Sequence, residues 1–324
     1  MRYLRFILVP LLLAACHDQP TALDGTVALH RRHAPSDAAR PARIISFGDS
    51  HSDLGNLHLA TGGFLAGPPY FEGRWTNGPN WLEELAARLR VPAVTASLAG
   101  GTGYAWGGAE TGSGTVAGFI PNVGAQIDLF LSQDALAGDE LLVVWAGTND
   151  GLQNVLSGGA AGSEPETAVM QISEHIRSLA AAGGRHFLVP DLHSLGLAPF
   201  FAGTPNADGA NAWTRAFNEL LEEELEVLED DLGIRILHLE VSELIDELVD
   251  HPKHFGLTNV TDQACDGCFE NFGGTPVPNP DDYLWWDAVH FTRVVHRILG
   301  VMATKLVLDD DDDDDDDQGD NDEG

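Results

Sequence analysis

The chain has 324 residues, 44% of them hydrophobic and 36 of them glycine, so it can bury one large core or at most two domains. Its formal net charge is −33, and −21 remains when the twelve acidic residues of the C-terminal run are set aside. An acidic surface repels phosphate backbones, and no basic stripe is present to track one, which argues against nucleic acid as a partner.

The N-terminus has the pattern of an export signal. Two arginines precede residues 6–13, an apolar run that is too short to cross a bilayer as a permanent helix. Residues 13–16, Leu-Ala-Ala-Cys, resemble the bacterial lipobox, in which the cysteine is lipidated and becomes the N-terminus after cleavage. We therefore expect Cys16 to carry a lipid anchor. The alternative is a plain secretory signal in which this cysteine is incidental.

These patterns divide the chain into segments. We expect a lipoprotein signal peptide over 1–15, a flexible tether over 16–42, a folded domain over 43–307 and a disordered acidic tail over 308–324. A solubilising role is favoured for the aspartate run, with calcium attraction as the alternative. The absence of aspartate at position 17 favours, by family analogy, the outer membrane of an exported protein over the inner membrane.

Strand and helix patterns alternate through the folded domain, and this alternation predicts helices on both faces of a mainly parallel sheet, that is, a three-layer α/β/α sandwich. Two glycine-rich stretches, 100–118 and 151–162, follow expected strands and are predicted to be loops that wall a site. The expected strands are 43–47, 141–146, 186–190 and 234–239, and the expected helices are 81–89, 125–136, 165–182, 212–232 and 294–306.

A single serine stands at the mouth of the first expected strand. Residues 47–56, Phe-Gly-Asp-Ser-His-Ser-Asp-Leu-Gly-Asn, place Ser50 just beyond the carboxyl end of that strand, where ligands bind in open α/β sheets. On local grounds the tripeptide around it is an ordinary capped turn. Ser50 becomes a candidate nucleophile if the chain also supplies a base and an oxyanion site.

A base and its partner are present near the other end of the chain. Asp287 and His290 are three residues apart, so a turn can bring the carboxylate to the imidazole and fix its tautomer. A capping aspartate beside a packing histidine is the alternative. For the oxyanion, Asn149 follows a buried apolar run, and the Gly107-Gly108 pair allows a backbone N–H to approach a ligand closely. Individually these three could be turn or packing residues.

Two cysteines besides Cys16 remain, and Cys265 and Cys268 have a spacing that suits a redox or zinc site in a cytosolic protein. No second pair of metal ligands with matching spacing is evident, and an exported protein meets an oxidising environment. We therefore predict a small local disulfide, and neither a metal site nor an organic cofactor.

In this order the motifs resemble those of the GDSL-type esterases/lipases of the SGNH-hydrolase superfamily, within its bacterial lipase and lysophospholipase-like branch, from about residue 43 to 306. The resemblance implies a flavodoxin-like fold and hydrolysis of carboxylic esters through an acyl-enzyme. It implies that Ser50 is the nucleophile, with Asp287 and His290 completing the triad. It further implies an oxyanion hole made of the Ser50 N–H, the Gly108 N–H (Gly107 in another register) and the Asn149 side chain.

Other residues are assigned by the same resemblance. Asp49, Asp53 and Asn56 are expected to hold the serine loop in shape, and Asp191 is expected to be structural. The chain departs from the family at His51, where an apolar residue is common, at Gly103 in place of asparagine and at Phe291 in place of proline. His51 is a rival base, although a neighbouring residue usually points away from the serine.

The substrate is not determined by the sequence beyond an ester-containing small molecule or lipid. Acyl transfer to an alcohol through the same acyl-enzyme is one alternative, and a surface lipoprotein that binds lipid or glycan without turnover is another. Several apolar residues could line an acyl pocket or equally pack the core: Phe64, Leu65, Phe71, Trp75, Phe119, Phe200 and Phe201.

Overall fold

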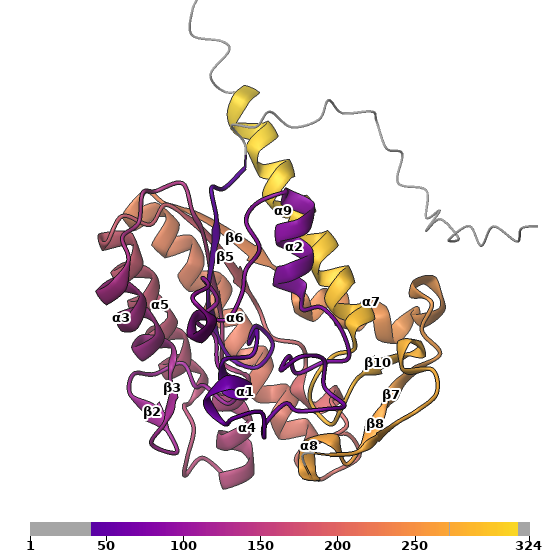
Figure 1. Ribbon diagram of the computed structural model, residues 1–324. Helices are drawn as coiled ribbons and strands as arrows, with labels where there is room; N and C mark the ends of the chain where they lie inside the picture. Colours follow the sequence, from indigo (N-terminus) through magenta and orange to yellow (C-terminus); the bar gives the residue numbers. More distant parts are fainter. Residues whose placement is uncertain (1–39, 272, 317–324) are drawn as a thin grey trace, which may run out of the picture. The chain divides into compact units, whose positions relative to one another are not determined.

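The computed structural model describes residues 40–271 and 273–316 (Figure 1). Its central sheet has four strands in the order β1-β4-β5-β6, and every neighbouring pair is parallel. The strands are β1 (Ile44–Gly48), β4 (Leu141–Trp145), β5 (His186–Pro190) and β6 (Arg235–Leu239). All five residues of β1 and of β4 are buried, as the continuous apolar runs predict for strands covered on both faces. The predicted α/β fold with a mainly parallel sheet is confirmed.

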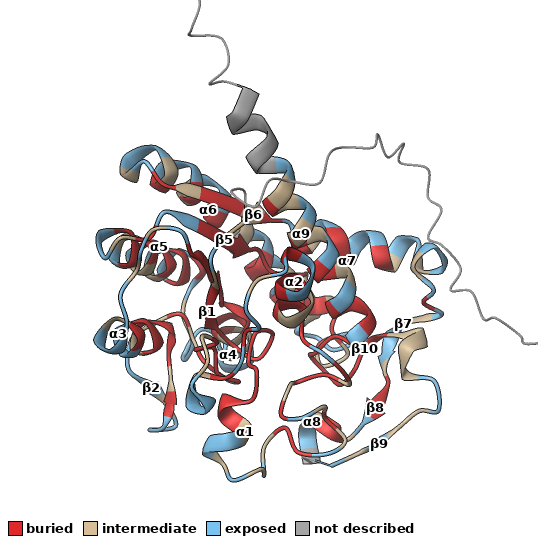
Figure 2. Ribbon diagram, turned by 45° about the horizontal axis from the view of Figure 1, so that its top comes forward, coloured by how far each residue is buried: buried red, intermediate tan, exposed pale blue. Residues whose placement is uncertain are grey.

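Helices cover both faces of this sheet (Figures 1 and 2). On one side α2 packs against α9, and on the other α5 packs against α6, with α3 beside β1. The helices that cover the two faces are α2 (Trp81–Leu89), α3 (Val123–Gln133), α5 (Pro165–Ala181), α6 (Ala207–Leu232), α7 (Val241–Asp250) and α9 (Arg293–Asp316). Within the described part of the chain, no helix is both long enough and apolar enough to span a bilayer.

Short elements connect these layers at the ends of the strands. They are α1 (Asn56–Ala60), α4 (Thr148–Ser157), α8 (Cys268–Asn271), the antiparallel pairs β2 (Thr115–Val116) with β3 (Ile120–Pro121) and β8 (Cys265–Asp266) with β9 (Thr275–Pro276), and the parallel pair β7 (Asn259–Gln263) with β10 (Tyr283–Trp285). Single 3₁₀ turns cover Ser97–Ala99, Leu195–Leu197, Pro252–Phe255 and Pro280–Asp282.

The segment 102–106 extends the sheet beyond β1. Gly103 forms a parallel bridge with Ser46, the Tyr104 N–H donates to the Ser46 carbonyl at 2.7 Å, and the Trp106 N–H donates to the Gly48 carbonyl at 3.0 Å. This pairing brings the glycine-rich loop alongside the strand that ends in the serine turn. There is little room for a side chain at Gly103, because a Cβ there would lie 3.0 Å from the Leu54 side chain.

The second glycine-rich stretch is only partly a loop. The sequence predicts a loop over 151–162, whereas α4 continues to Ser157. Gly151 is a packing glycine, because a Cβ on it would lie 2.6 Å from the Trp213 ring. The prediction failed because a glycine that permits close packing of two helices has the same sequence signature as a loop glycine.

The last helix is longer than the sequence predicts. It is expected to end at residue 306, and it continues to Asp316, into the segment 308–324 that is expected to be a disordered tail. An ion pair of Lys305 with Asp309, one turn apart at 4.0 Å, joins the apolar part of α9 to the aspartate run. Residues 317–324 lie outside the described residues, as do the predicted signal peptide and most of the tether.

A second, smaller hydrophobic cluster lies apart from the main core around the sheet. It joins three segments far apart in sequence, namely 57–75, 106–120 and 264–286, and it includes Tyr70 and Trp286. None of these segments has a regular hydrophobic period in the sequence that would indicate this cluster. Its members are Leu57, Ala66, Tyr70, Trp75, Trp106, Ala109, Ile120, Ala264, Cys265, Cys268 and Trp286.

Candidate active site

Ser50 lies in a tight turn directly after β1. Gly48, the last residue of that strand, has φ of +146°, and a Cβ on it would lie 2.0 Å from the Trp145 carbonyl oxygen in β4. Only glycine fits this close approach. The turn leaves Ser50 with 8% of its surface exposed, at the carboxyl end of the parallel strands.

His290 and Asp287 reach Ser50 from a turn between β10 and α9. The Nε2 atom of His290 lies 2.8 Å from Oγ of Ser50. The Nδ1 atom of His290 lies 2.9 and 2.8 Å from the two carboxylate oxygens of Asp287. The three side chains that the sequence singles out therefore form one hydrogen-bonded chain, although Ser50 and His290 are 240 positions apart. With a proton on Nδ1 donated to Asp287, Nε2 can accept the hydroxyl proton of Ser50.

Asp287 is completely buried and fully hydrogen-bonded. Its Oδ1 atom accepts the N–H groups of Val289 at 2.9 Å and His290 at 2.8 Å, and its Oδ2 atom accepts the hydroxyl of Tyr70 at 2.6 Å. Burial alone would raise the pKa of Asp287, but the nearby His290 and these donors outweigh it and hold the pKa below its usual range. Asp287 is thus an anion placed to stabilise a positive charge on His290.

Three groups at the predicted oxyanion hole remain able to donate. Among the described residues, the backbone N–H groups of Ser50 and Gly108 have no hydrogen-bond partner, whereas the Gly107 N–H donates to Asp53 at 2.9 Å. Gly108 has φ of +82°, which favours glycine. The Asn149 amide donates one proton to the Ala109 carbonyl at 2.9 Å, so its other N–H stays available. Of the two glycines, Gly108 is therefore the one whose backbone N–H is free to donate to an oxyanion.

Removing the Asn149 amide provides a test of this donor set. We expect Asn149→Ala to lower kcat about a hundredfold with little change in KM, because an oxyanion donor acts mainly in the transition state. Steady-state kinetics on a short p-nitrophenyl ester measures both constants. Asn154→Ala, on the same helix α4, is the matched control and should retain the wild-type kcat; an unchanged kcat in Asn149→Ala would remove this residue from the oxyanion hole.

Asp53 and Asn56 connect the serine loop to the loop that carries Gly108. The carboxylate of Asp53 accepts N–H groups of Gly55 and Asn56 at 2.8 and 2.7 Å, in addition to that of Gly107. The Asn56 amide donates to the carbonyls of Gly103 and Ala105 at 2.8 and 2.9 Å. Asp49 is also buried and accepts the His51 N–H at 3.0 Å. Burial raises the pKa of Asp49 to about 7.

His51, the rival base, makes no hydrogen bond to the serine hydroxyl. Its ring stacks on Trp145 with centroids 5.0 Å apart, and its centroid lies 5.6 Å from that of His193 and 5.7 Å from that of His290. Among the described residues, neither ring nitrogen of His51 or of His193 has a hydrogen-bond partner. No group of three His, Cys, Asp or Glu side chains in that part of the chain is placed to hold a metal ion.

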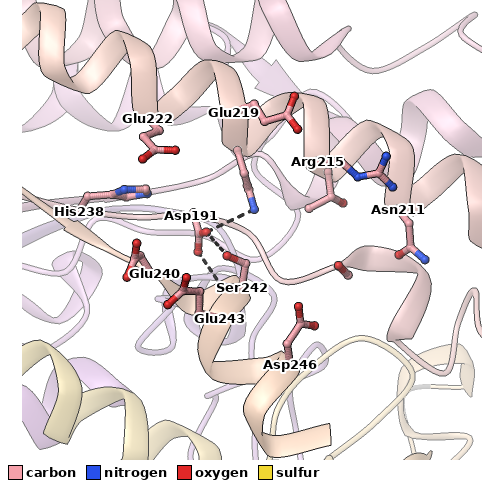
Figure 3. A pocket seen from close by; sticks show the side chains of 13 residues that line it. Asp191, Asn211, Arg215, Glu219, Glu222, His238, Glu240, Ser242, Glu243 and Asp246 are labelled. Carbon is pink, nitrogen blue, oxygen red and sulfur yellow. Dashed lines mark hydrogen bonds between the residues drawn. The ribbon is translucent and has the colours of Figure 1, made fainter. Parts of the chain in front are cut away.

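Asp191 lines a cavity of about 420 Å³ together with residues of α6, β6 and α7 (Figure 3). Its carboxylate accepts the Ser242 N–H at 2.8 Å and is bonded to the Ser242 hydroxyl and to the Asn218 amide. These bonds tie the end of β5 to the start of α7. The carboxylates of Glu219, Glu222, Glu240, Glu243 and Asp246 also line this cavity.

The apolar residues proposed from sequence as pocket walls differ in burial, and Leu65, Phe71 and Phe200 are half-buried. Trp75 lies against the His290 ring, with centroids 5.0 Å apart, and Phe201 is buried in the main core, whereas Phe64 and Phe119 are exposed. Phe269, which the sequence analysis does not single out, lies 5.9 Å from the His290 ring centroid. Phe269 follows Cys268, which forms a disulfide with Cys265. Cys16 lies outside the described residues.

A family model, GDSL-like Lipase/Acylhydrolase, matches residues 44–301. The chain belongs to this family. It is 30% identical over 260 residues to a phosphatidylcholine-sterol acyltransferase of Aeromonas hydrophila, an alignment that covers 79% of this chain and 72% of the relative. It is 26% identical over 321 residues to a GDSL esterase/lipase of Arabidopsis thaliana, which covers 82% of each. Among solved structures, a lipolytic G-D-S-L family protein of Veillonella parvula aligns with 16% identity and a TM-score of 0.45, over 81% of this chain and 96% of that one.

Membership of this family makes the chain an esterase/lipase that acts on carboxylic esters. The motifs that carry the resemblance in sequence lie within the matched range, from the serine block at 47–56 to Asp287 and His290. Sequence reasoning did not identify Tyr70 or Phe269 as residues near the triad, and it named Trp75 only as a possible pocket wall. Tyr70 and Trp75 lie in a loop without a periodic pattern, and Phe269 lies in the short helix α8, so no hydrophobic period marks any of the three.

Proposed function

We propose that the protein hydrolyses carboxylic esters by nucleophilic catalysis at Ser50. The hydroxyl of Ser50 attacks the ester carbonyl while His290 Nε2 takes its proton, and Asp287 stabilises the resulting imidazolium. The Ser50 and Gly108 N–H groups, with the free N–H of Asn149, bind the negative oxygen of the tetrahedral intermediate. His290 then returns the proton to the leaving alkoxide, and water releases the acid from the acyl-enzyme by the same sequence of proton transfers.

One observation supports this proposal above all others, namely the continuous chain of hydrogen bonds from Ser50 through His290 to Asp287, with separations of 2.8 and 2.8–2.9 Å. The serine and the Asp287–His290 pair come from two motifs at opposite ends of the folded domain. Ester hydrolysis requires a nucleophile, a base and an oriented carboxylate in this sequence, and a binding protein requires none of them.

A second candidate is acyl transfer to an alcohol. It is supported by the relative from Aeromonas hydrophila, which is a phosphatidylcholine-sterol acyltransferase. The two reactions share the acyl-enzyme and differ only in the molecule that accepts the acyl group, so the triad favours neither. Product analysis with an ester substrate in the presence of glycerol or a sterol separates them, because hydrolysis yields the free acid and transfer yields a new ester.

Labelling by a fluorophosphonate tests the nucleophile directly. We expect the folded protein to react once, at Ser50, because an activated serine attacks phosphorus and an ordinary serine does not. Mass spectrometry of the tryptic digest identifies the modified peptide, and protein held in denaturant serves as the control that should not react. A folded protein that stays unlabelled would favour a lipid- or glycan-binding role without turnover.

We also propose that the protein is exported and held at the bacterial outer membrane by a lipid on Cys16. The Leu-Ala-Ala-Cys sequence at 13–16 and the short apolar run before it support this proposal. Mass spectrometry of the mature N-terminus from membrane fractions would show a diacylglyceryl-modified Cys16 in place of the uncleaved signal. A Cys16→Ala variant should then leave the membrane fraction.

A further inference from the structure

Tyr70 lies outside the catalytic motifs of the chain but makes a direct hydrogen bond to Asp287 of the proposed triad. Its hydroxyl donates to Oδ2 of Asp287 at 2.6 Å, across 217 positions of sequence. Tyr70 is 5% exposed and Asp287 is completely buried, so water does not substitute easily for this donor. Hydrogen bonds to a buried charge are among the strongest in proteins.

Removal of the Tyr70 hydroxyl would change the balance of donors on the two carboxylate oxygens. Oδ1 of Asp287 accepts from two backbone N–H groups as well as from His290, whereas Oδ2 accepts only from His290 and Tyr70 among the described residues. Without Tyr70, the oxygen closest to Nδ1 of His290 would depend on the imidazole alone. The hydroxyl therefore limits rotation of the carboxylate and keeps it facing the ring.

The ring of Tyr70 is fixed by its neighbours. It makes edge-to-face contacts with Trp75 and Trp286, with centroids 5.4 and 6.1 Å apart, inside the second hydrophobic cluster. Trp75 in turn lies against the His290 ring. Burial, with the negative charge of Asp287, raises the pKa of Tyr70 above its usual range, which favours the protonated hydroxyl that donates to Asp287.

The loop that carries Tyr70 is attached to both halves of the site. The Thr76 hydroxyl donates to the Phe291 carbonyl at 2.8 Å, and the Asn77 side chain accepts the Arg293 N–H at 2.7 Å. Asn80 donates to the carbonyl of His51, next to the nucleophile, at 2.8 Å. The segment 70–80 thus spans from the serine turn to the Asp287–His290 turn.

We infer that Tyr70 is a positioning residue of the esterase, which orients the Asp287 carboxylate toward His290 and keeps it ionised through a buried hydrogen bond. The inference rests on the proposed function. It adds Tyr70, which lies outside the family's motifs, to the proposed triad of Ser50, His290 and Asp287. Tyr70 acts through Asp287 and does not contact the reacting serine.

The test is Tyr70→Phe in the full chain, which removes one oxygen atom and keeps the ring in its place. We expect kcat to fall about tenfold or more, as for loss of a hydrogen bond to a charged group, with KM unchanged. We also expect the acid limb of kcat/KM to move to higher pH, because without this donor the Asp287 carboxylate attracts the imidazole proton of His290 more strongly. A role confined to packing would lower thermal stability without moving that limb.

Tyr104→Phe is the matched control. Tyr104 is a buried tyrosine whose ring packs on Phe47 and Phe130 in the main core, away from Asp287, and this variant should keep the wild-type kcat and pH profile. A readout that needs no turnover is the downfield proton resonance of the His290 ring N–H, which should shift in Tyr70→Phe and not in Tyr104→Phe.

The outcomes distinguish this inference from the proposed function. If the wild-type protein neither hydrolyses esters nor reacts with a fluorophosphonate, the proposed function fails, and the His290 resonance still decides whether Tyr70 acts on the pair. If the wild type is active and Tyr70→Phe has the same kcat, pH profile and resonance, Tyr70 has no positioning role and the proposed function stands.

Discussion

Ser50→Ala is expected to lower kcat on a short p-nitrophenyl ester by about a thousandfold or more while leaving the protein folded. The reason is geometric, since the Ser50 hydroxyl is the atom that His290 Nε2 faces at 2.8 Å. His290→Ala should cause a loss of similar size. The measurement is single-turnover or steady-state kinetics, with circular dichroism to confirm that each variant is folded.

The double variant makes this prediction sharper. Residues that act as one catalytic unit lose their effect together, so Ser50→Ala combined with His290→Ala should be no slower than either single variant. Ser46→Ala is the matched control, because Ser46 is buried on β1 and its hydroxyl has no partner among the described residues. Multiplicative losses in the double variant would mean that the two residues act separately, which contradicts the proposed mechanism.

The second large effect concerns stability in acid. Burial, with the nearby His290, lowers the pKa of His193 from 6.5 to about 3 and that of His296 to about 3, and burial lowers the pKa of His51 well below its usual value. Below pH 6.5 the unfolded chain takes up protons on these histidines that the folded protein does not. The stability they contribute is therefore present above pH 6.5 and is lost as the pH falls from 6.5 toward 3.

A single substitution isolates this effect. Each such histidine lowers the free energy of unfolding by up to about 1.4 kcal/mol for each pH unit within that window. His193→Leu should therefore lose less stability than the wild type between pH 6.5 and 4.5, by about 2 kcal/mol, as measured by urea unfolding at several pH values. Parallel pH dependences for wild type and variant would mean that His193 is protonated in the folded protein.

Comparing the wild type with His193→Leu at each pH removes the contribution of the other buried groups to the free energy of unfolding. Asp49, with its pKa raised to about 7, has the opposite sign, because between pH 3.8 and 7 the folded state holds a proton that the unfolded state has lost. Asp49 is present in both proteins, so its contribution cancels in the difference. His186→Leu, at the exposed start of β5, is the matched control and should follow the wild-type dependence.

The sequence predicted the sheet and the residues of the candidate triad because each is specified locally. β1 and β4 are continuous apolar runs, which few other structures accommodate, and Ser50, Asp287 and His290 lie in motifs whose spacing is characteristic of the family. The helix expected over 81–89 is also specified locally, since the structure shows a capping box between Asn80 and Glu83 at its start.

What the sequence did not predict depends on contacts between distant segments. Tyr70 lies in a loop rich in glycine and proline, and its role follows only from Asp287, which the fold brings to its hydroxyl. Gly151 was assigned to a loop because nothing near it in sequence indicates the Trp213 ring that it packs against. The burial of His51, His193 and His296, and the contact of the first two, are likewise properties of the tertiary structure.

The candidate nucleophile follows the first strand and the candidate base lies just ahead of the last helix, so most of the chain must be synthesised before the two can meet. A molecule cut between α8 and β10 would retain every strand of the central sheet and still have no imidazole to activate its serine. Turnover would therefore report that the segment carrying His290 is present beside the serine turn, and chains that end before this segment would be inactive.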